Sequence, residues 1–170
     1  LAVDIHRNLL LPIEEMDLPV TAETRTGDTP QSKKQRQRGT PPNILLTTPE
    51  SLALLLSYTD AAKIFRRLRT IVIDELHALA PNKRGELLAL GLARLARLAP
   101  QARRVGLSAT VACPDALEAY LSPTGRAGQS DVARVTGGGA VAAKVKIMIG
   151  RGHFPWSGHM GTYAVEDIYE

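Results

Sequence analysis

The sequence predicts an α/β fold in which a parallel sheet is flanked by helices. Three short apolar segments, at residues 43–47, 70–73 and 103–107, have the composition of buried strands. Each is followed by a segment with a helical pattern, and successive segments start about 30 residues apart, which is the length of a βαβ unit. The ends of the three segments, at Thr47, Asp74 and Ser108, should therefore lie at the same edge of one parallel sheet.

The central segment ends on a group of polar side chains. Its β-branched residues at positions 71–73 predict a strand that is buried on both faces. Asp74 and Glu75 follow at once, and then His77. Adjacent carboxylates beyond a strand suit a hydrated divalent cation and a base for an attacking water. They equally suit an ordinary helix start, where acidic residues are favoured, and the segment Asp74-Glu75-Leu76-His77 alone leaves both interpretations open.

Two helix starts are predicted from capping residues. Pro30 and Pro49 each fit the first helical position. Thr29 or Asp28 would cap the first helix, and Thr48 would cap the second. The unpaired backbone amides of such starts can hold a phosphate, although ordinary capping is the alternative explanation.

The remaining elements are predicted by periodicity. Helices are expected at residues 1–15, 83–99 and 114–121, and a short strand at 18–24. Two basic groups, one after Pro30 and one before the central strand, are expected to lie in solvent. Their members are Lys33, Lys34, Arg36 and Arg38, and then Lys63, Arg66, Arg67 and Arg69.

The composition limits the class of protein. A chain of 170 residues that is 44% hydrophobic and 22% charged can form a globular domain with a sizeable core. Only 4% of the residues are aromatic, so stacking on bases is not the main binding device, whereas a net charge of +4 permits an anionic partner. The single cysteine, Cys113, excludes an internal disulfide and fits a reducing, cytoplasmic location. No apolar run approaches the ~18 residues that span a membrane.

The amino-acid composition of the chain changes beyond Ser122. The glycine run at 137–139 is typical of a linker, and short strands could form at 132–135 and 145–149. His153 and His159 lack the ligand spacing of a metal site. We therefore expect a main domain at 1–136, a linker at 137–150 and the start of a second domain at 151–170.

A series of short motifs carries a resemblance over nearly the whole chain. In this order, the series is similar to the first motor domain of superfamily 2 helicases of the DExH type. It resembles the Lhr (large helicase-related) group, and in particular the ligase-associated DExH-box helicases. The residues are Leu1-Ala2-Val3-Asp4, Arg25-Thr26-Gly27-Asp28, Thr47-Thr48-Pro49-Glu50-Ser51, Asp74-Glu75-Leu76-His77, Ser108-Ala109-Thr110 and Pro155-Trp156-Ser157-Gly158-His159.

The resemblance implies a RecA-like fold and a set of roles around ATP. Asp74 would hold, through water, the Mg²⁺ that bridges the ATP phosphates, and Glu75 would orient and deprotonate the attacking water. His77 would act with the hydroxyls of Ser108 and Thr110 to link the ATP site to movement on the nucleic acid.

The resemblance also implies a nucleic-acid contact made by Arg25, Thr26, Gly27 and Thr48. DNA is the favoured nucleic acid, DNA repair the favoured process, and a DNA ligase or nuclease a candidate partner. No membrane partner is implied.

One departure from the family pattern is clear. Helicases of this kind use a phosphate loop, G-x-x-x-x-G-K-[ST], and this sequence contains no Gly-Lys pair. The expected fold is thus a partial RecA-like sheet without the phosphate-loop strand. We expect this chain alone to be inactive in ATP hydrolysis. Two alternatives stay open: a truncated, non-hydrolysing remnant that binds nucleic acid weakly, and a metal-dependent hydrolase that uses Asp74, Glu75 and His77 without a nucleotide.

Overall fold

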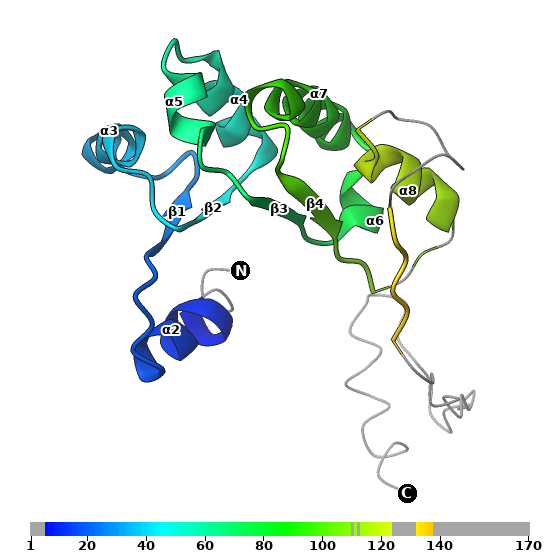
Figure 1. Cartoon of the computed structure of the whole chain (residues 1–170), viewed down its shortest axis with the longest axis horizontal. Coiled ribbons are helices and arrows are strands. Elements are labelled where there is room, and N and C mark those ends of the chain that lie inside the picture. Colours follow the sequence, from blue (N-terminus) through cyan, green and yellow to red (C-terminus); the bar gives the residue numbers. More distant parts are fainter. Residues whose placement is uncertain (1–5, 110, 112, 124–131, 138–170) are drawn as a thin grey trace, which may run out of the picture. The chain divides into compact units, whose positions relative to one another are not determined.

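The computed structural model describes residues 6–109, 111, 113–123 and 132–137. The chain divides into two compact units, Leu1–Ala133 and Arg134–Glu170. Along the described part of the first unit, one or two helices separate successive strands (Figure 1). They are the π-helix η1 (His6–Leu10), α2 (Leu11–Glu15), β1 (Ala22–Arg25), α3 (Gln31–Gly39), β2 (Ile44–Thr47), α4 (Pro49–Ser57), α5 (Ala61–Phe65), β3 (Thr70–Ile73), α6 (Leu76–Leu79), α7 (Lys83–Leu98), β4 (Arg103–Gly106) and α8 (Pro114–Leu121).

The strands confirm the predicted α/β class but not the predicted single sheet. β1 pairs with β2 and β3 pairs with β4, and both pairs are parallel. Among the described strands, no backbone pairing joins β2 to β3, so two two-stranded sheets replace the one that was expected. The two pairs are connected instead by the packing of α4, which follows β2, on α7, which follows β3.

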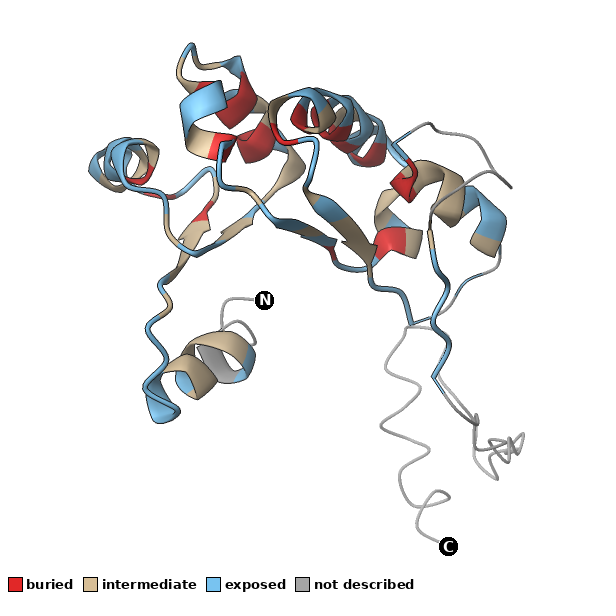
Figure 2. Cartoon of the chain, in the orientation of Figure 1, coloured by how far each residue is buried: buried red, intermediate tan, exposed pale blue. Residues whose placement is uncertain are grey.

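The hydrophobic core lies mainly between α4 and α7, where Figure 2 shows buried residues on both helices. Leu55 is 1% exposed, and Leu92 and Leu95 are 1% and 2% exposed. Each leucine buried in this way contributes about 1.5–3 kcal/mol relative to an exposed one. The predicted leucine stripe of the helix at 83–99 is therefore confirmed, and its exposed residues Arg94 and Arg97 lie outside this core.

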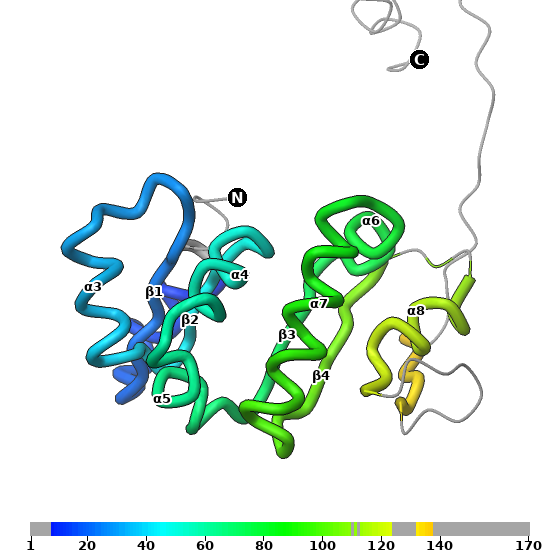
Figure 3. Tube along the Cα trace, turned by 90° about the horizontal axis from the view of Figure 1, so that it is seen from above, coloured from blue at the N-terminus to red at the C-terminus, as the bar shows by residue number. Residues whose placement is uncertain are grey.

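Helices α4, α5 and α7 cover one face of the strands. α4, α5 and α7 lie on the same side of the strands (Figures 1 and 3). Ile73 of β3 is buried, but Val72, whose side chain points to the opposite face, is 58% exposed. The expectation that this strand is buried on both faces is therefore wrong, because the described residues cover only one of them.

Only one of the two predicted helix caps forms. The Thr48 hydroxyl accepts a hydrogen bond from Ser51 N at 3.3 Å, and Pro49 opens α4 as expected. Thr29 does not cap α3, because its hydroxyl accepts the backbone N–H of Thr26 at 2.9 Å and closes a turn instead. Pro30 precedes α3 in an extended conformation, so its expected place in the first helical turn is also wrong.

The segment after β4 is held against α7 by polar contacts. The Tyr120 hydroxyl of α8 donates to the carbonyl of Gly85 at 2.6 Å. The Arg104 guanidinium donates to the carbonyls of Leu92, at 2.9 Å, and Leu121, at 3.2 Å. Burial lowers the pKa of Arg104 and raises that of Tyr120.

The predicted C-terminal elements have different outcomes. α8 is confirmed, whereas residues 132–137 form no helix or strand, so the strand expected at 132–135 is wrong. The possible strand at 145–149 and the second domain at 151–170 lie outside the described residues and stay predictions. Within the described part of the chain, no helix has both the length and the apolar character of a membrane span.

Candidate functional site

The chain turns sharply where β3 ends. The Asp74 carboxylate accepts the backbone N–H of Glu75 at 2.9 Å, and both side chains are exposed. Glu75 has φ 49° and ψ 43°, in the left-handed region that a non-glycine residue seldom adopts. Such a conformation costs about 1–3 kcal/mol and persists only where neighbouring contacts impose it.

The contacts that impose this turn come from the neighbouring strand. Leu107 N donates to Ile73 O at 2.9 Å, and Leu76 N donates to Leu107 O at 3.0 Å. Leu76 is 2% exposed and lies over Gly106, where a Cβ atom would approach Leu76 Cδ2 to 2.6 Å. A glycine at the end of β4 thus makes room for the side chain that anchors α6.

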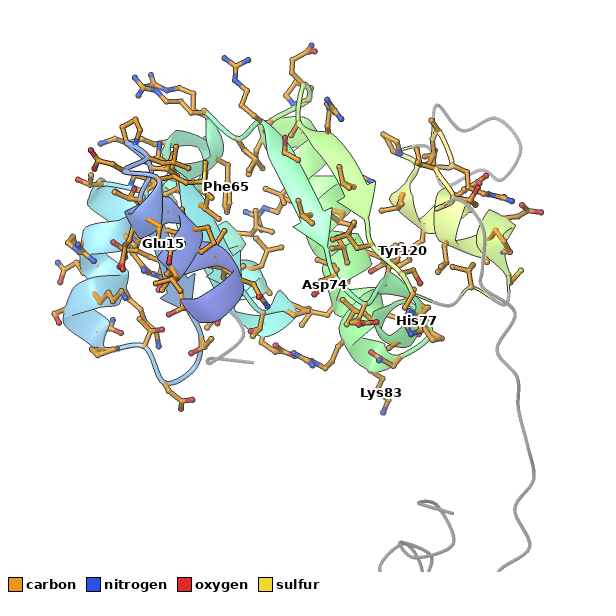
Figure 4. The ribbon with its side chains drawn as sticks, turned by 90° about the horizontal axis from the view of Figure 1, so that it is seen from below. Glu15, Phe65, Asp74, His77, Lys83 and Tyr120 are labelled. Carbon is orange, nitrogen blue, oxygen red and sulfur yellow. The ribbon has the colours of Figure 1, made fainter. Side chains whose placement is uncertain are left out.

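His77 and Ser108, which were predicted to act together, are brought into contact. His77 Nδ1 lies 2.8 Å from Ser108 Oγ and 3.5 Å from Glu75 Oε2. Figure 4 shows Asp74 and His77 at the same end of the β3–β4 pair. The imidazole can therefore link the carboxylate segment after β3 to the segment after β4, whereas Thr110 lies outside the described residues.

The carboxylates at this turn suit Mg²⁺, which takes oxygen ligands and keeps several waters. Asp74 and Glu75 are exposed, and one oxygen of Asp74 has the Glu75 amide as a partner. In the described residues, no three His, Cys, Asp or Glu side chains converge as a metal-binding group. These side chains thus fit a cation held largely through water and by a second ligand such as a phosphate.

A bidentate ion pair connects the starts of α4 and α7. Arg84 Nε and Nη2 donate to the two carboxylate oxygens of Glu50 at 2.6 Å and 3.2 Å. The hydrogen bonds from Arg84 lower the pKa of Glu50 to about 2, and the same contact raises the pKa of Arg84. Sequence reasoning missed this pair, because each residue alone looks like an ordinary exposed residue in a first helical turn.

A second group of predicted residues lies where β1 and β2 end. Thr47 Oγ1 donates to Arg25 O at 2.9 Å and ties the two strand ends together. Gly27 is exposed, a Cβ added to it would meet no atom within 4 Å, and its carbonyl accepts Lys34 Nζ at 2.8 Å. Thr26 and Thr48 are half-buried at this edge, in the turn after β1 and at the start of α4.

The side chain of Arg25 is buried between β1 and α3. Its side chain is 2% exposed, and Nη1 donates to Lys34 O at 2.8 Å and to Gln37 Oε1 at 3.3 Å. The guanidinium is therefore used to hold α3 against β1, and it offers little surface to a nucleic acid. The contact of Arg25 with nucleic acid that the resemblance implies stays a prediction.

The basic helix α3 is also less solvated than predicted. Arg36 pairs with Glu23 at 2.9 Å, and Arg38 contacts both oxygens of Asp60 at 3.0 Å. The Arg38 guanidinium lies 3.9 Å from the centroid of the Tyr58 ring, a cation–π geometry. The basic group before β3, in contrast, is exposed as expected.

Comparison with known proteins identifies the class of this fold and then the family. Parallel strand pairs flanked by helices, as in solved helicase structures, define a RecA-like helicase fold. Residues 1–119 match the DEAD/DEAH box helicase family, and the chain belongs to that family.

Relatives in the Lhr group cover most of the chain and confirm the predicted resemblance to that group. The chain is 43% identical over 133 residues to the "Lhr helicase/probable uracil glycosylase" of Mycolicibacterium smegmatis, which is 72% of this chain and 9% of that protein. It is 42% identical over 132 residues to the "Lhr helicase/uracil glycosylase" of Escherichia coli, with 71% and 8% covered. This chain thus spans about a tenth of these relatives.

A solved structure shares the fold at similar identity. The helicase Lhr of Mycobacterium smegmatis, bound to single-stranded DNA and AMP-PNP, has a TM-score of 0.63 and 41% identity, over 76% of this chain and 17% of that one. The helicase MrfA, bound to DNA and AMPPNP, has a TM-score of 0.59 and 30% identity, over 74% of this chain and 18% of that one.

Proposed function

We propose that this chain is part of an ATP-dependent DNA helicase that couples ATP hydrolysis to movement along, or unwinding of, nucleic acid. The observation that carries the proposal is the 2.8 Å contact between His77 Nδ1 and Ser108 Oγ beside two exposed carboxylates. This contact supports the coupling of hydrolysis to movement because it joins the carboxylate segment after β3 to the end of the neighbouring strand, β4.

Each side chain in this cluster has a proposed role in hydrolysis. Glu75 orients the attacking water and accepts its proton, an effect that typically contributes about 10²–10⁴ in rate. Asp74 holds Mg²⁺ through water, and the bound ion would offset charge on the transferred phosphoryl group. His77 transmits the state of this site to the segment that begins at Ser108.

The β1–β2 strand pair has a proposed role in nucleic-acid binding. Thr26, Gly27 and Thr48 follow the carboxyl ends of β1 and β2, where the two threonine hydroxyls and the Gly27 amide would meet the nucleic-acid backbone. Such groups contact phosphates and sugars, which carry no sequence information, so binding should be indifferent to base sequence. DNA is favoured because both solved relatives are bound to DNA.

The domain division and the wider context belong to the same proposal. Residues 1–136 form a partial first motor domain, 137–150 a linker and 151–170 the start of a second motor domain. A role in DNA repair and a DNA ligase or nuclease encoded nearby are supported by the family resemblance, and the single cysteine, Cys113, supports a cytoplasmic location.

This chain alone is proposed to be inactive in hydrolysis, since its sequence holds no Gly-Lys pair for a phosphate loop. The loop lysine and amides each make charge-assisted hydrogen bonds of about 1.5–3 kcal/mol. Without two of these bonds, ATP affinity should be lower by at least about two decades.

ATP turnover with and without single-stranded DNA tests the proposal. The proteins compared are this chain, a longer protein that adds a phosphate loop upstream and a second motor domain downstream, and its Glu75→Gln variant. We expect DNA-stimulated turnover only in the longer protein and its abolition by Glu75→Gln. Turnover by the 170-residue chain itself would show that the phosphate loop is not necessary.

The missing Gly-Lys pair also favours a second candidate, a non-hydrolysing protein that binds nucleic acid weakly. This candidate predicts weak, salt-sensitive binding by the chain and no turnover by the longer protein. Turnover by the longer protein decides against it, and binding that is absent even at low salt would exclude it altogether.

A further inference from the structure

A group of cations gathers at the edge of the β3–β4 pair opposite the proposed ATP site. We name these residues the amino-edge patch: Lys63, Arg66, Arg67, Arg69 and Arg103. Arg69 and Arg103 lie at the amino ends of the paired strands, and Arg103 N donates to Arg69 O at 2.9 Å. Figure 4 shows Asp74 and His77 at one end of this strand pair and Phe65, which lies between Lys63 and Arg66 in the sequence, toward the other.

Three cations of the patch line a shallow hollow. Arg66, Arg67 and Arg69 line an open depression of about 560 Å³ together with Leu68 and Gln101. Lys63 lies on α5, three residues before Arg66, a spacing that places two side chains on the same helical face. Gln101 comes from the turn before β4, so two segments distant in sequence meet at this surface.

The charge of the patch is unbalanced. All five side chains belong to exposed residues, and no carboxylate among the described residues pairs with any of them. The cations of α3 differ, because Arg36 and Arg38 pair with Glu23 and Asp60. Like charges at short range repel, so this surface would be stabilised by an external polyanion.

We propose that the amino-edge patch binds the sugar–phosphate backbone of duplex nucleic acid, at a surface separate from the strand ends that hold Asp74 and Thr48. The choice of nucleic acid over other polyanions rests on the proposed function. No described residue between 61 and 70 is an exposed large hydrophobic of the kind that inserts into a lipid surface. The patch contains no aromatic residue for base stacking, which favours the charge-dense duplex over a single strand.

The test measures binding of the 170-residue chain, without nucleotide, to a fluorescent DNA duplex of about 20 base pairs over about 50–200 mM salt. The patch variant is R66Q/R67Q/R69Q. The matched control is K83Q/R94Q/R97Q, which removes the same charge from exposed residues of α7. The single strand of the same length serves as a second probe.

We expect the patch variant to lose at least about tenfold in duplex affinity at low salt. Its slope of log K against log salt should fall by about two or more, because each neutralised phosphate contributes about 0.9. The control variant should lose less than about threefold in duplex affinity. The patch variant should bind the single strand with nearly the affinity of the unchanged chain.

Three outcomes would overturn the proposal. The first is an equal loss of duplex affinity in the patch variant and the control variant. The second is no loss of duplex affinity in the patch variant. The third is binding of the unchanged chain to anionic phospholipid vesicles that the patch variant loses while it keeps duplex binding. The double variant K63Q/R67Q gives the same comparison if the triple variant fails to show the circular dichroism of the unchanged chain. Because no nucleotide is used, a failure of the duplex-binding proposal can be told apart from a failure of the proposed ATP turnover.

Discussion

His77 Nδ1 lies 2.8 Å from Ser108 Oγ, although the two residues are 31 positions apart in the sequence. The parallel register of β3 and β4 produces this contact, because it sets Ile73 opposite Gly106 at the ends of the two strands. The residues that follow each strand therefore emerge side by side. The strained Glu75 and the buried Leu76 then direct His77 toward the end of β4.

Gly85→Ala should destabilise the protein. A Cβ at this position would lie 2.6 Å from Ala80 O and would also contact Leu79 O, and backbone atoms cannot move aside cheaply. We expect a cost of about 1–3 kcal/mol. In thermal unfolding this corresponds to a lower Tm, by about 2–4 °C per kcal/mol for a chain of this size.

Gly91→Ala is the matched control on the same helix. Its Cβ would lie 3.5 Å from side-chain carbons of Leu52 and Leu56, which is an ordinary contact. Since alanine is favoured over glycine in a helix by up to about 1 kcal/mol, this variant should be neutral or stabilised. Equal Tm values for the two variants would contradict the packing described for the start of α7.

Arg25→Met should lower stability rather than remove a direct nucleic-acid contact. The substitution removes the donors to Lys34 O and Gln37 Oε1, and bonds from a charged donor contribute about 1.5–3 kcal/mol. Chemical denaturation measures this loss, with Arg36→Met as control, because its pair with Glu23 is exposed and contributes about 0–1 kcal/mol. Unchanged stability together with weaker DNA binding would instead support the direct nucleic-acid contact that the resemblance implies for Arg25.

Glu50→Gln should change the dependence of stability on acid. The pKa of Glu50 is about 2 in the folded protein against 4.5 for an unperturbed group, so its pair with Arg84 contributes fully above pH 4.5. That contribution is lost as the pH falls from 4.5 toward 2. The Tm difference between the unchanged chain and Glu50→Gln should therefore be constant at neutral pH and shrink over this range.

Salt gives a second check on the same pair. Both side chains are about half exposed, so their attraction should be small and screened at about 1 M salt. A Tm difference that survives high salt, or that persists unchanged at pH 2, would mean that Glu50 acts through packing and not through its charge.

Much of the fold could be predicted because local signals agree with the tertiary structure. The leucine stripe of α7 and the Thr48 cap of α4 are short-range patterns, and both are confirmed. The strand ends at Asp74 and Ser108 also lie together as expected. The Thr29 cap failed because a nearby backbone amide, that of Thr26, competed for the same hydroxyl.

The features that sequence reasoning missed depend on long-range contacts. The burial of Arg25 depends on how α3 packs on β1, and the Glu50–Arg84 pair joins two helix starts 34 positions apart. The exposure of Val72 reflects which elements cover the sheet, and the composition of the strand carries no information about that. The left-handed conformation of Glu75 has no local sequence signal either, since glycine is the usual residue there.

The most direct test of the account is the ratio of DNA strands separated to ATP hydrolysed in the longer protein, with and without Ser108→Ala. Because this change removes the oxygen 2.8 Å from His77 Nδ1, we predict that basal hydrolysis persists while DNA stimulation and strand separation fall by at least about tenfold. Ser57→Ala, which removes a hydroxyl that donates to Leu54 O on α4, should leave the ratio unchanged. Strand separation per ATP that is unaffected by Ser108→Ala would contradict the claim that the His77–Ser108 contact couples hydrolysis to movement.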